Sequence, residues 1–119
     1  MNNYTKDFSF VWDEITLPIS YDSDWRAAES LIMDIVIQET HMMKEYAEEE
    51  ISHMQRKYYI SKSSTDPGIF FKLTDNWIEL TARYVAPARQ RRILRTKISR
   101  RILEEIQRSE GIRIASESI

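Results

Sequence analysis

The sequence predicts a single α+β domain whose elements follow in the order strand, helix, strand, strand, helix, strand. Three observations support this prediction: an alternating apolar segment near the N-terminus, two β-rich runs around a short turn, and two long segments with helical apolar spacing. The chain has 119 residues, of which 42% are hydrophobic and 30% charged, with 2 Gly and 3 Pro. This composition suits one hydrophobic core and excludes a collagenous or largely disordered chain.

The first strand is expected at residues 14–21, where apolar and polar positions alternate. The apolar positions are Ile15, Leu17, Ile19 and Tyr21. Pro18 predicts an edge strand or a bulge, because proline cannot donate to a strand ladder.

Upstream of this strand the large apolar residues occupy even-numbered positions, whereas the apolar positions of the strand itself are odd-numbered. The upstream residues are Phe8, Phe10 and Trp12. The apolar face therefore switches near Trp12 and Asp13, which predicts a bulge or a strand that leaves one sheet and enters another. We assign residues 1–13 to the end of a preceding β domain or a strand leading inward, and residues 14–119 to the main domain.

A long first helix is expected from Trp25 to about Lys57, since no helix breaker occurs before Ser61. Three possible N-caps precede it: Asp22, Ser23 and Asp24. Residues 25–37 are apolar around most of the helix, which is more than one sheet contact needs. Residues 44–57 are highly charged, so this part is expected to project from the core or to lean on a partner.

A β-hairpin is expected from two β-rich runs, residues 69–74 and 77–85, that flank Asp75 and Asn76. The residues before it, 61–68, have the composition of a loop.

The sequence also predicts the register of this hairpin. A two-residue turn pairs Lys72 with Glu79 on one face. On the apolar face it pairs Phe71 with Leu80 and Leu73 with Ile78. A one-residue slip would lose both the charge pair and the common apolar face.

A second helix is expected at residues 88–109, after Pro87 ends the hairpin. Its core-facing stripe is Leu94, Ile98, Ile102 and Ile106. Gly111 is expected as its C-terminal cap, and residues 112–115 as a last short strand. With right-handed crossovers, this βαββαβ order predicts a ferredoxin-like sandwich with two helices on one face of a four-stranded antiparallel sheet, the first helix long and partly projecting.

Several function classes find no support in the sequence. The absence of Cys excludes disulfides, thiolate metal sites and a cysteine nucleophile. The longest apolar runs have three or four residues, whereas a membrane span needs about 20. The polar opening, residues 1–7, does not resemble a signal peptide.

Candidate catalytic and metal-binding residues are equally sparse. His41 and His53 are the two histidines, and we interpret both as surface residues. The acidic run at residues 48–50 is expected to be a solvated helix face. Asp13 and Glu14 are neighbours in a strand and point to opposite faces, so they cannot flank one substrate together unless a bulge lies there. We expect no enzymatic activity, no cofactor and no metal.

The charge is distributed unevenly along the chain. Residues 1–60 carry 5 basic and 12 acidic side chains, net −7, and residues 61–119 carry 12 basic and 7 acidic, net +5. The two halves are therefore expected to attract each other or other copies of the chain.

Much of the positive charge falls within one run that has no acidic residue. It contains Arg83, Arg89, Arg91, Arg92, Arg95, Lys97, Arg100 and Arg101. Such a run is compatible with phosphate binding, but helical spacing scatters these residues around the second helix instead of focusing them on one ridge. We expect them to pair with the acidic first helix, within the chain or between subunits, and we expect no nucleic-acid partner.

Three separated blocks of the chain resemble a known family. NYTKDFSFVWDEITLPISYDSDWRAAESLI, DNWIELTARYVAPARQRR and ILEEIQRSEGIRIA resemble, in this order, the cytoplasmic C-terminal region of prokaryotic mechanosensitive channels of small conductance. The start at Asn3 looks like the end of that family's middle β domain. The long charged helix from Lys44 and the loop to Gly68 exceed the family's shorter connection.

The resemblance implies a ring of seven subunits whose ferredoxin-like domains wall a cytoplasmic vestibule below a tension-opened gate. The full channel would lie in the cell membrane of a prokaryote under osmotic stress, with ions and small osmolytes passing the vestibule, whereas this fragment alone would be a monomer or small oligomer. The expected intersubunit or vestibule-field residues are Phe8, Phe10, Trp12, Trp77, Arg91, Arg92 and Arg95. Two alternatives stay open: a basic ferredoxin-like nucleic-acid-binding module and a small-molecule-sensing oligomer.

Overall fold

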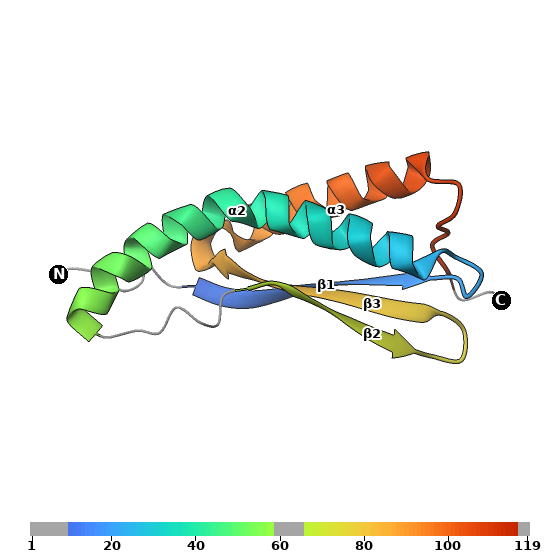
Figure 1. Ribbon diagram of the computed structural model, residues 1–119, viewed down its shortest axis with the longest axis horizontal. Coiled ribbons are helices and arrows are strands. Elements are labelled where there is room, and N and C mark those ends of the chain that lie inside the picture. The colour runs from blue at the N-terminus through green and yellow to red at the C-terminus, as the bar shows by residue number, and fades with distance from the viewer. Residues whose placement is uncertain (1–9, 59–65, 117–119) are drawn as a thin grey trace.

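A computed structural model describes residues 10–58 and 66–116, with side chains described over 10–41 and 66–116. It is an α+β fold in which two helices lie on one face of a three-stranded antiparallel sheet (Figure 1). The elements are β1 (Phe10–Ile19), α2 (Trp25–Tyr58), β2 (Gly68–Leu73), β3 (Ile78–Pro87), the 3-10 turn η1 (Ala88–Gln90) and α3 (Arg91–Arg108). The strand order β1-β3-β2 places β3 at the centre.

Strand β1 starts earlier than expected and contains no bulge between residues 10 and 19. It pairs with β3 without interruption from Phe10 opposite Pro87 to Ile19 opposite Ile78. The predicted bulge, or passage into another sheet, is therefore wrong for residues 10–19. Trp12 does lie on the face of the sheet away from the helices, whereas Asp13 continues the row of side chains that faces the helices and is itself buried. The prediction of an edge position is confirmed for the described sheet, in which β1 is an outer strand.

The hairpin register is confirmed at every predicted pair. Lys72 lies opposite Glu79, and the apolar pairs are Phe71 with Leu80 and Leu73 with Ile78. The apolar face is buried on β3 but remains exposed on β2, where Leu73 is 63% exposed. The physical reason is the position of β2 at the outer side of the sheet, whereas α3 packs over β1 and β3.

The helix α2 has the expected length, 34 residues, and begins at the expected cap. The backbone N–H of Ala27 donates to the Asp24 carboxylate at 3.1 Å, which satisfies a donor of the first turn. The expectation that its later, charged part projects rests on side chains 42–58, which lie outside those described.

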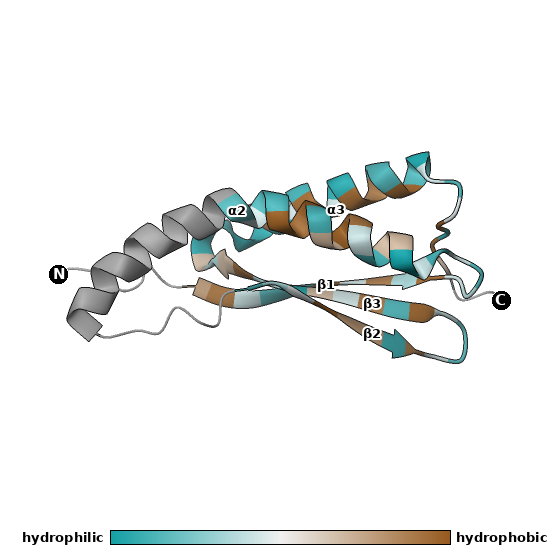
Figure 2. Ribbon diagram, in the orientation of Figure 1, coloured by the Kyte–Doolittle hydropathy of each residue, from teal (hydrophilic) through white to brown (hydrophobic). Residues whose placement is uncertain are grey.

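The helix α3 buries the predicted stripe, and its apolar side faces the sheet (Figure 2). The four stripe residues are Leu94, Ile98, Ile102 and Ile106. The predicted cap is wrong: α3 ends at Arg108, and the N–H of Ser109 donates to the carbonyls of Glu105 and Ile106. Gly111 instead accepts a 2.7 Å hydrogen bond from the N–H of Asp24, so it ties the end of the chain to the start of α2.

The core fills the space between the two helices and the sheet. From the sheet it takes Ile19, Ile78, Leu80, Ala82, Tyr84 and Ala86, and from α2 it takes Ala28, Ile32, Ile35 and Val36. Over the described residues, no helix is long and apolar enough to span a membrane.

The last strand expected at residues 112–115 is reduced to one bridge between Ile19 and Ile114. Two hydrogen bonds flank the bridge, from Ser20 N–H to the Arg113 carbonyl at 2.9 Å and from Ala115 N–H to the Pro18 carbonyl at 3.0 Å. The described element order is therefore strand, helix, strand, strand, helix, and it differs from the expected βαββαβ order.

Candidate functional site

A buried carboxylate near the start of β1 lies beside two arginine side chains of α3. Asp13 is only 4% exposed, because its parity on β1 turns it toward the helices. Antiparallel pairing places it opposite Tyr84 on β3. The Tyr84 hydroxyl donates to Asp13 Oδ2 at 3.2 Å, and the Glu14 backbone N–H donates to Asp13 Oδ1 at 2.9 Å.

Two arginines from the first turns of α3 complete the surroundings of Asp13. Arg91 Nε lies 3.4 Å and Arg95 Nη1 lies 3.7 Å from Asp13 Oδ1. Their spacing of one helical turn puts both guanidinium groups on the same side of α3. Each arginine side chain is about half exposed, at 52% and 51%, so the ion pairs join a buried carboxylate to two cations at the surface.

The Tyr84 side chain is fully buried, and its environment fixes its protonation. Burial is the main cause that raises the pKa of Tyr84 above its usual value, and the negative charge of Asp13 and the hydrogen bond to it add to the effect. The hydroxyl therefore keeps its proton and remains a donor to the carboxylate.

A second group of side chains lies on the face of the sheet away from the helices. Arg83 stacks on Trp12, with its guanidinium carbon 4.5 Å from the ring centroid. Arg83 Nε also lies 3.9 Å from a carboxylate oxygen of Glu14. Glu14 thus lies on the opposite side of β1 from Asp13, as predicted for neighbours in a strand.

These two groups of side chains border a surface hollow that has two adjoining parts. We call the two parts together the arginine hollow. One part, about 380 Å³, is lined by Trp12, Asp13, Glu14, Arg83, Arg91 and Arg95. The other, about 700 Å³, is lined by Ala88, Arg89, Arg91, Arg92, Ile93 and Arg95. Arg91 and Arg95 border both parts, so the two parts meet at the side chains that Asp13 holds.

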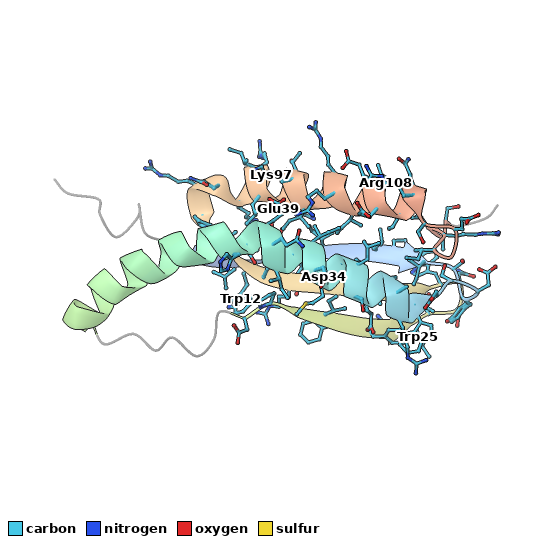
Figure 3. The ribbon with its side chains drawn as sticks, turned by 45° about the horizontal axis from the view of Figure 1, so that its top comes forward. Trp12, Trp25, Asp34, Glu39, Lys97 and Arg108 are labelled. Atoms are coloured by element: carbon cyan, nitrogen blue, oxygen red, sulfur yellow. The ribbon has the colours of Figure 1, made fainter. Side chains whose placement is uncertain are left out.

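The expected pairing of arginines with the first helix is confirmed within the chain at Arg101, and within the chain it does not form at Arg91 and Arg95. Arg101 Nη1 contacts Glu39 of α2 at 2.9 Å. Glu39 lies between the helices, whereas Lys97 and Arg108 point away from the sheet (Figure 3). Arg91 and Arg95 pair instead with Asp13, because the start of α3 lies over β1.

The other predicted site residues are dispersed. Phe8 lies outside the described residues, and Phe10 is half-buried opposite Pro87. Trp77 lies just before β3, at the far end of the sheet from Trp12. Its buried Nε1–H finds no acceptor within the described part of the chain.

Asp13 and Tyr84 are the residues that the sequence interpretation did not select as a site. The available signal was the odd-numbered position of Asp13, which it shares with the core-facing residues of β1 in a segment where apolar and polar residues otherwise alternate. Among the described side chains, no group of three or more His, Cys, Asp or Glu could hold a metal ion. The arrangement offers guanidinium donors to an anion, and it offers no nucleophile with an adjacent base.

Comparison with protein-family models and with curated proteins finds no match to this chain.

Proposed function

We propose that this chain is the cytoplasmic vestibule domain of a mechanosensitive channel of small conductance, acting in subunit assembly and in the wall around the ion and osmolyte portals. The sequence blocks that resemble this family motivate the proposal. The structural observation that best supports it is the face of the sheet away from the two helices, on which the described structure leaves Trp12 and Phe70 at 40% and 57% exposure. Large aromatic side chains on an open sheet face are typical of a surface that packs on another subunit.

The finer fold assignment is part of the same proposal. We assign the bridge between Ile19 and Ile114 to the position of a fourth strand, which would give a ferredoxin-like sheet with the C-terminal strand beside β1. The bridge is antiparallel and its hydrogen bonds use the carbonyl of Pro18 and the N–H of Ser20, alternate groups along β1. In the ring, a neighbouring subunit could extend this short contact.

The arginine hollow has a defined role in this proposal. Its half-exposed guanidinium groups create a positive potential near the vestibule wall and favour the approach of anions over cations. The full channel would lie in the cell membrane, with this domain on its cytoplasmic side and seven copies forming the ring. The domain itself would perform no catalysis and need no cofactor.

The decisive experiment uses the full gene product. Hydrophobic helices should precede the sequence of this chain, and the full protein should give tension-activated currents in excised membrane patches. Phe70→Ser in that protein should reduce ring assembly, measured by light scattering in detergent, whereas Tyr21→Ser, on an exposed residue outside the sheet, should not. A gene without upstream membrane helices would refute the proposal.

The isolated 119-residue chain gives a second test. Multi-angle light scattering should show a monomer or small oligomer, because the family's ring depends largely on parts outside this region. A stable heptamer at micromolar concentration would contradict this expectation.

Nucleic-acid binding is the rival that the arginines of α3 favour. Labelled single- and double-stranded oligonucleotides, titrated at about 150 mM salt, distinguish the two. Submicromolar binding whose logarithmic salt slope falls by nearly one for each arginine removed would support the rival.

A further inference from the structure

We propose that the arginine hollow binds a small, multiply charged phosphate anion, with pyrophosphate as the probe. This inference does not depend on the proposed channel function. It rests on the charge of the lining, on the way Asp13 holds two guanidinium groups, and on the neutralisation of other cations of α3.

The lining has a clear excess of positive charge. Arg89 has a partner of its own, so it is left out of the count. The other described lining residues include four arginines, at positions 83, 91, 92 and 95, and two carboxylates, Asp13 and Glu14, so their net charge is +2. The first turn of α3 contains no acidic residue. One monovalent anion would leave half of this charge uncompensated, which favours a multiply charged ligand.

Asp13 orients the two central arginines without using all their donors. It contacts Arg91 through Nε and Arg95 through Nη1. A guanidinium group has five N–H donors, so each arginine retains donors for a second acceptor. Because Asp13 is buried and is held by Tyr84, it restricts both side chains before a ligand arrives. Preorganised forks of this kind suit the oxygens of a phosphate group.

Further along α3, two cations are already neutralised within the chain. Arg101 pairs with Glu39 on α2 at 2.9 Å, and Arg108 pairs with Glu105 at 3.0 Å. Lys97 and Arg100 add exposed positive charge in the middle of the helix, but the densest cluster of described cations is at its start, where Arg91, Arg92 and Arg95 lie within five residues. This focus favours a compact anion over an extended polyanion that would need a long basic track.

The contact between Trp12 and Arg83 favours a phosphate ligand without an attached nucleobase. The ring is exposed at the border of the hollow and would be a natural platform for a nucleobase. Arg83 already covers one face of the ring at 4.5 Å. A nucleotide base that stacked on that face would have to displace this cation, whereas pyrophosphate would not.

Isothermal titration of the 119-residue chain with pyrophosphate tests the site. Pyrophosphate should bind with micromolar affinity at low salt, and inorganic phosphate should bind more weakly. Arg92→Gln should weaken binding about tenfold, since one charge-assisted contact is lost. Arg108→Gln, far along the same helix, should leave binding unchanged and is the matched control. Equal affinities of these two variants, or no binding at millimolar pyrophosphate, would overturn the proposal.

Asp13→Asn tests whether Asp13 positions the arginines. Loss of positioning should weaken pyrophosphate binding, whereas loss of the negative charge alone should strengthen it. If Asp13 serves to orient Arg91 and Arg95, its neutralisation weakens pyrophosphate binding although a repelling negative charge is removed. Tighter binding by this variant would show that charge alone matters and would overturn the positioning role. Circular dichroism should first confirm that Asp13→Asn is folded. If it is not, the comparison of Arg92→Gln with Arg108→Gln still tests the site.

Competing ligands identify the source of the phosphate. ATP should bind no more tightly than pyrophosphate if the ring of Trp12 is unavailable to a base. Oligonucleotides that bind more tightly than pyrophosphate, with a steep salt dependence, would replace this proposal by the nucleic-acid function.

Discussion

The Tyr84 hydroxyl donates a 3.2 Å hydrogen bond to the carboxylate of Asp13 across the pairing of β3 with β1. Both side chains are buried, so this contact places a charged group inside the apolar layer between the sheet and α3. A buried carboxylate is costly unless its oxygens are satisfied, and here a hydroxyl, a backbone N–H and two guanidinium groups surround it.

The first prediction concerns the hydroxyl of Tyr84. Tyr84→Phe keeps the ring in the core but removes a donor to a buried charge, so the free energy of unfolding should fall by about 1–3 kcal/mol. Urea unfolding followed by circular dichroism measures this loss. Tyr21→Phe is the matched control, because the Tyr21 hydroxyl donates to the Thr74 carbonyl at an exposed position. A loss in the control as large as that in Tyr84→Phe would contradict the assigned importance of the buried contact.

The second prediction concerns alkaline pH. The pKa of Tyr84 is raised in the folded chain, mainly by burial, whereas in the unfolded chain the hydroxyl ionises at its usual value of about 10. Above that pH the unfolded chain binds fewer protons than the folded chain, so stability falls as pH rises. The stability advantage of the wild type over Tyr84→Phe should therefore be constant at neutral pH and shrink progressively as the pH rises above about 10. Urea midpoints of both proteins measure it, and a constant difference would contradict the burial of an ionisable hydroxyl.

The sequence predicts the β2–β3 hairpin in detail because several constraints there agree. A slip of one residue would separate Lys72 from Glu79 and turn the apolar side chains of β3 away from the helices. The stripe on α3 is predicted equally well, since helical spacing alone determines which side chains share a face.

The site was not predictable from the same patterns, because it depends on pairing between distant segments. Asp13 is 71 residues from Tyr84, and only the β1–β3 register brings them together. The parity of Phe10 and Trp12 indicates a change of apolar face near Asp13, and a hydrophobicity pattern gives no reason to place a lone acidic residue in the core. The cap at Gly111 failed for a similar reason, since a contact with Asp24 at the start of α2 decides the path of that segment.

The third prediction concerns the packing of β2 against α2. The rings of Phe71 and Trp25 meet edge to face, with centroids 5.3 Å apart. Phe71→Ala should reduce the free energy of unfolding by about 1–2 kcal/mol, because an aromatic contact at a partly exposed site is lost. Phe70→Ala, on the adjacent residue and the opposite face, should change the stability of the monomer by less than about 0.5 kcal/mol. If urea unfolding gave equal losses of unfolding free energy for Phe71→Ala and Phe70→Ala, the two faces of β2 would contribute equally to stability and the prediction would be wrong.

The fourth prediction concerns the core-facing side of α3. Ile98 is fully buried, whereas Ile93 on the same helix is 62% exposed. Ile98→Ala should cost about 2–5 kcal/mol through lost burial and the cavity that remains, and Ile93→Ala should cost less than about 0.5 kcal/mol. Thermal unfolding of both variants checks this difference. A similar loss for the two changes would mean that α3 is rotated about its axis from the position described.

The last prediction concerns the ion pairs that hold the start of α3 to β1. Changing Arg91 and Arg95 together to Gln leaves the Asp13 carboxylate buried without its cations. Removing one partner of an exposed ion pair costs about 0–1 kcal/mol, whereas leaving a fully buried charge unpaired costs about 3–5 kcal/mol. Because these arginines are half exposed and the carboxylate keeps two other donors, the double change should cost about 1–3 kcal/mol. Urea unfolding measures the loss, and Lys97→Gln on the outward side of α3 is the control (Figure 3).

The same arginine changes in an Asp13→Asn background separate the ion pairs from other effects. Without the buried charge there is no carboxylate to leave unpaired, so the two changes should cost clearly less than in the wild type. The difference between the two backgrounds is the coupling energy of the cluster. A coupling close to zero would show that the arginines stabilise the fold through the packing of their aliphatic stems, and that the carboxylate is satisfied by Tyr84 and the backbone N–H of Glu14 alone.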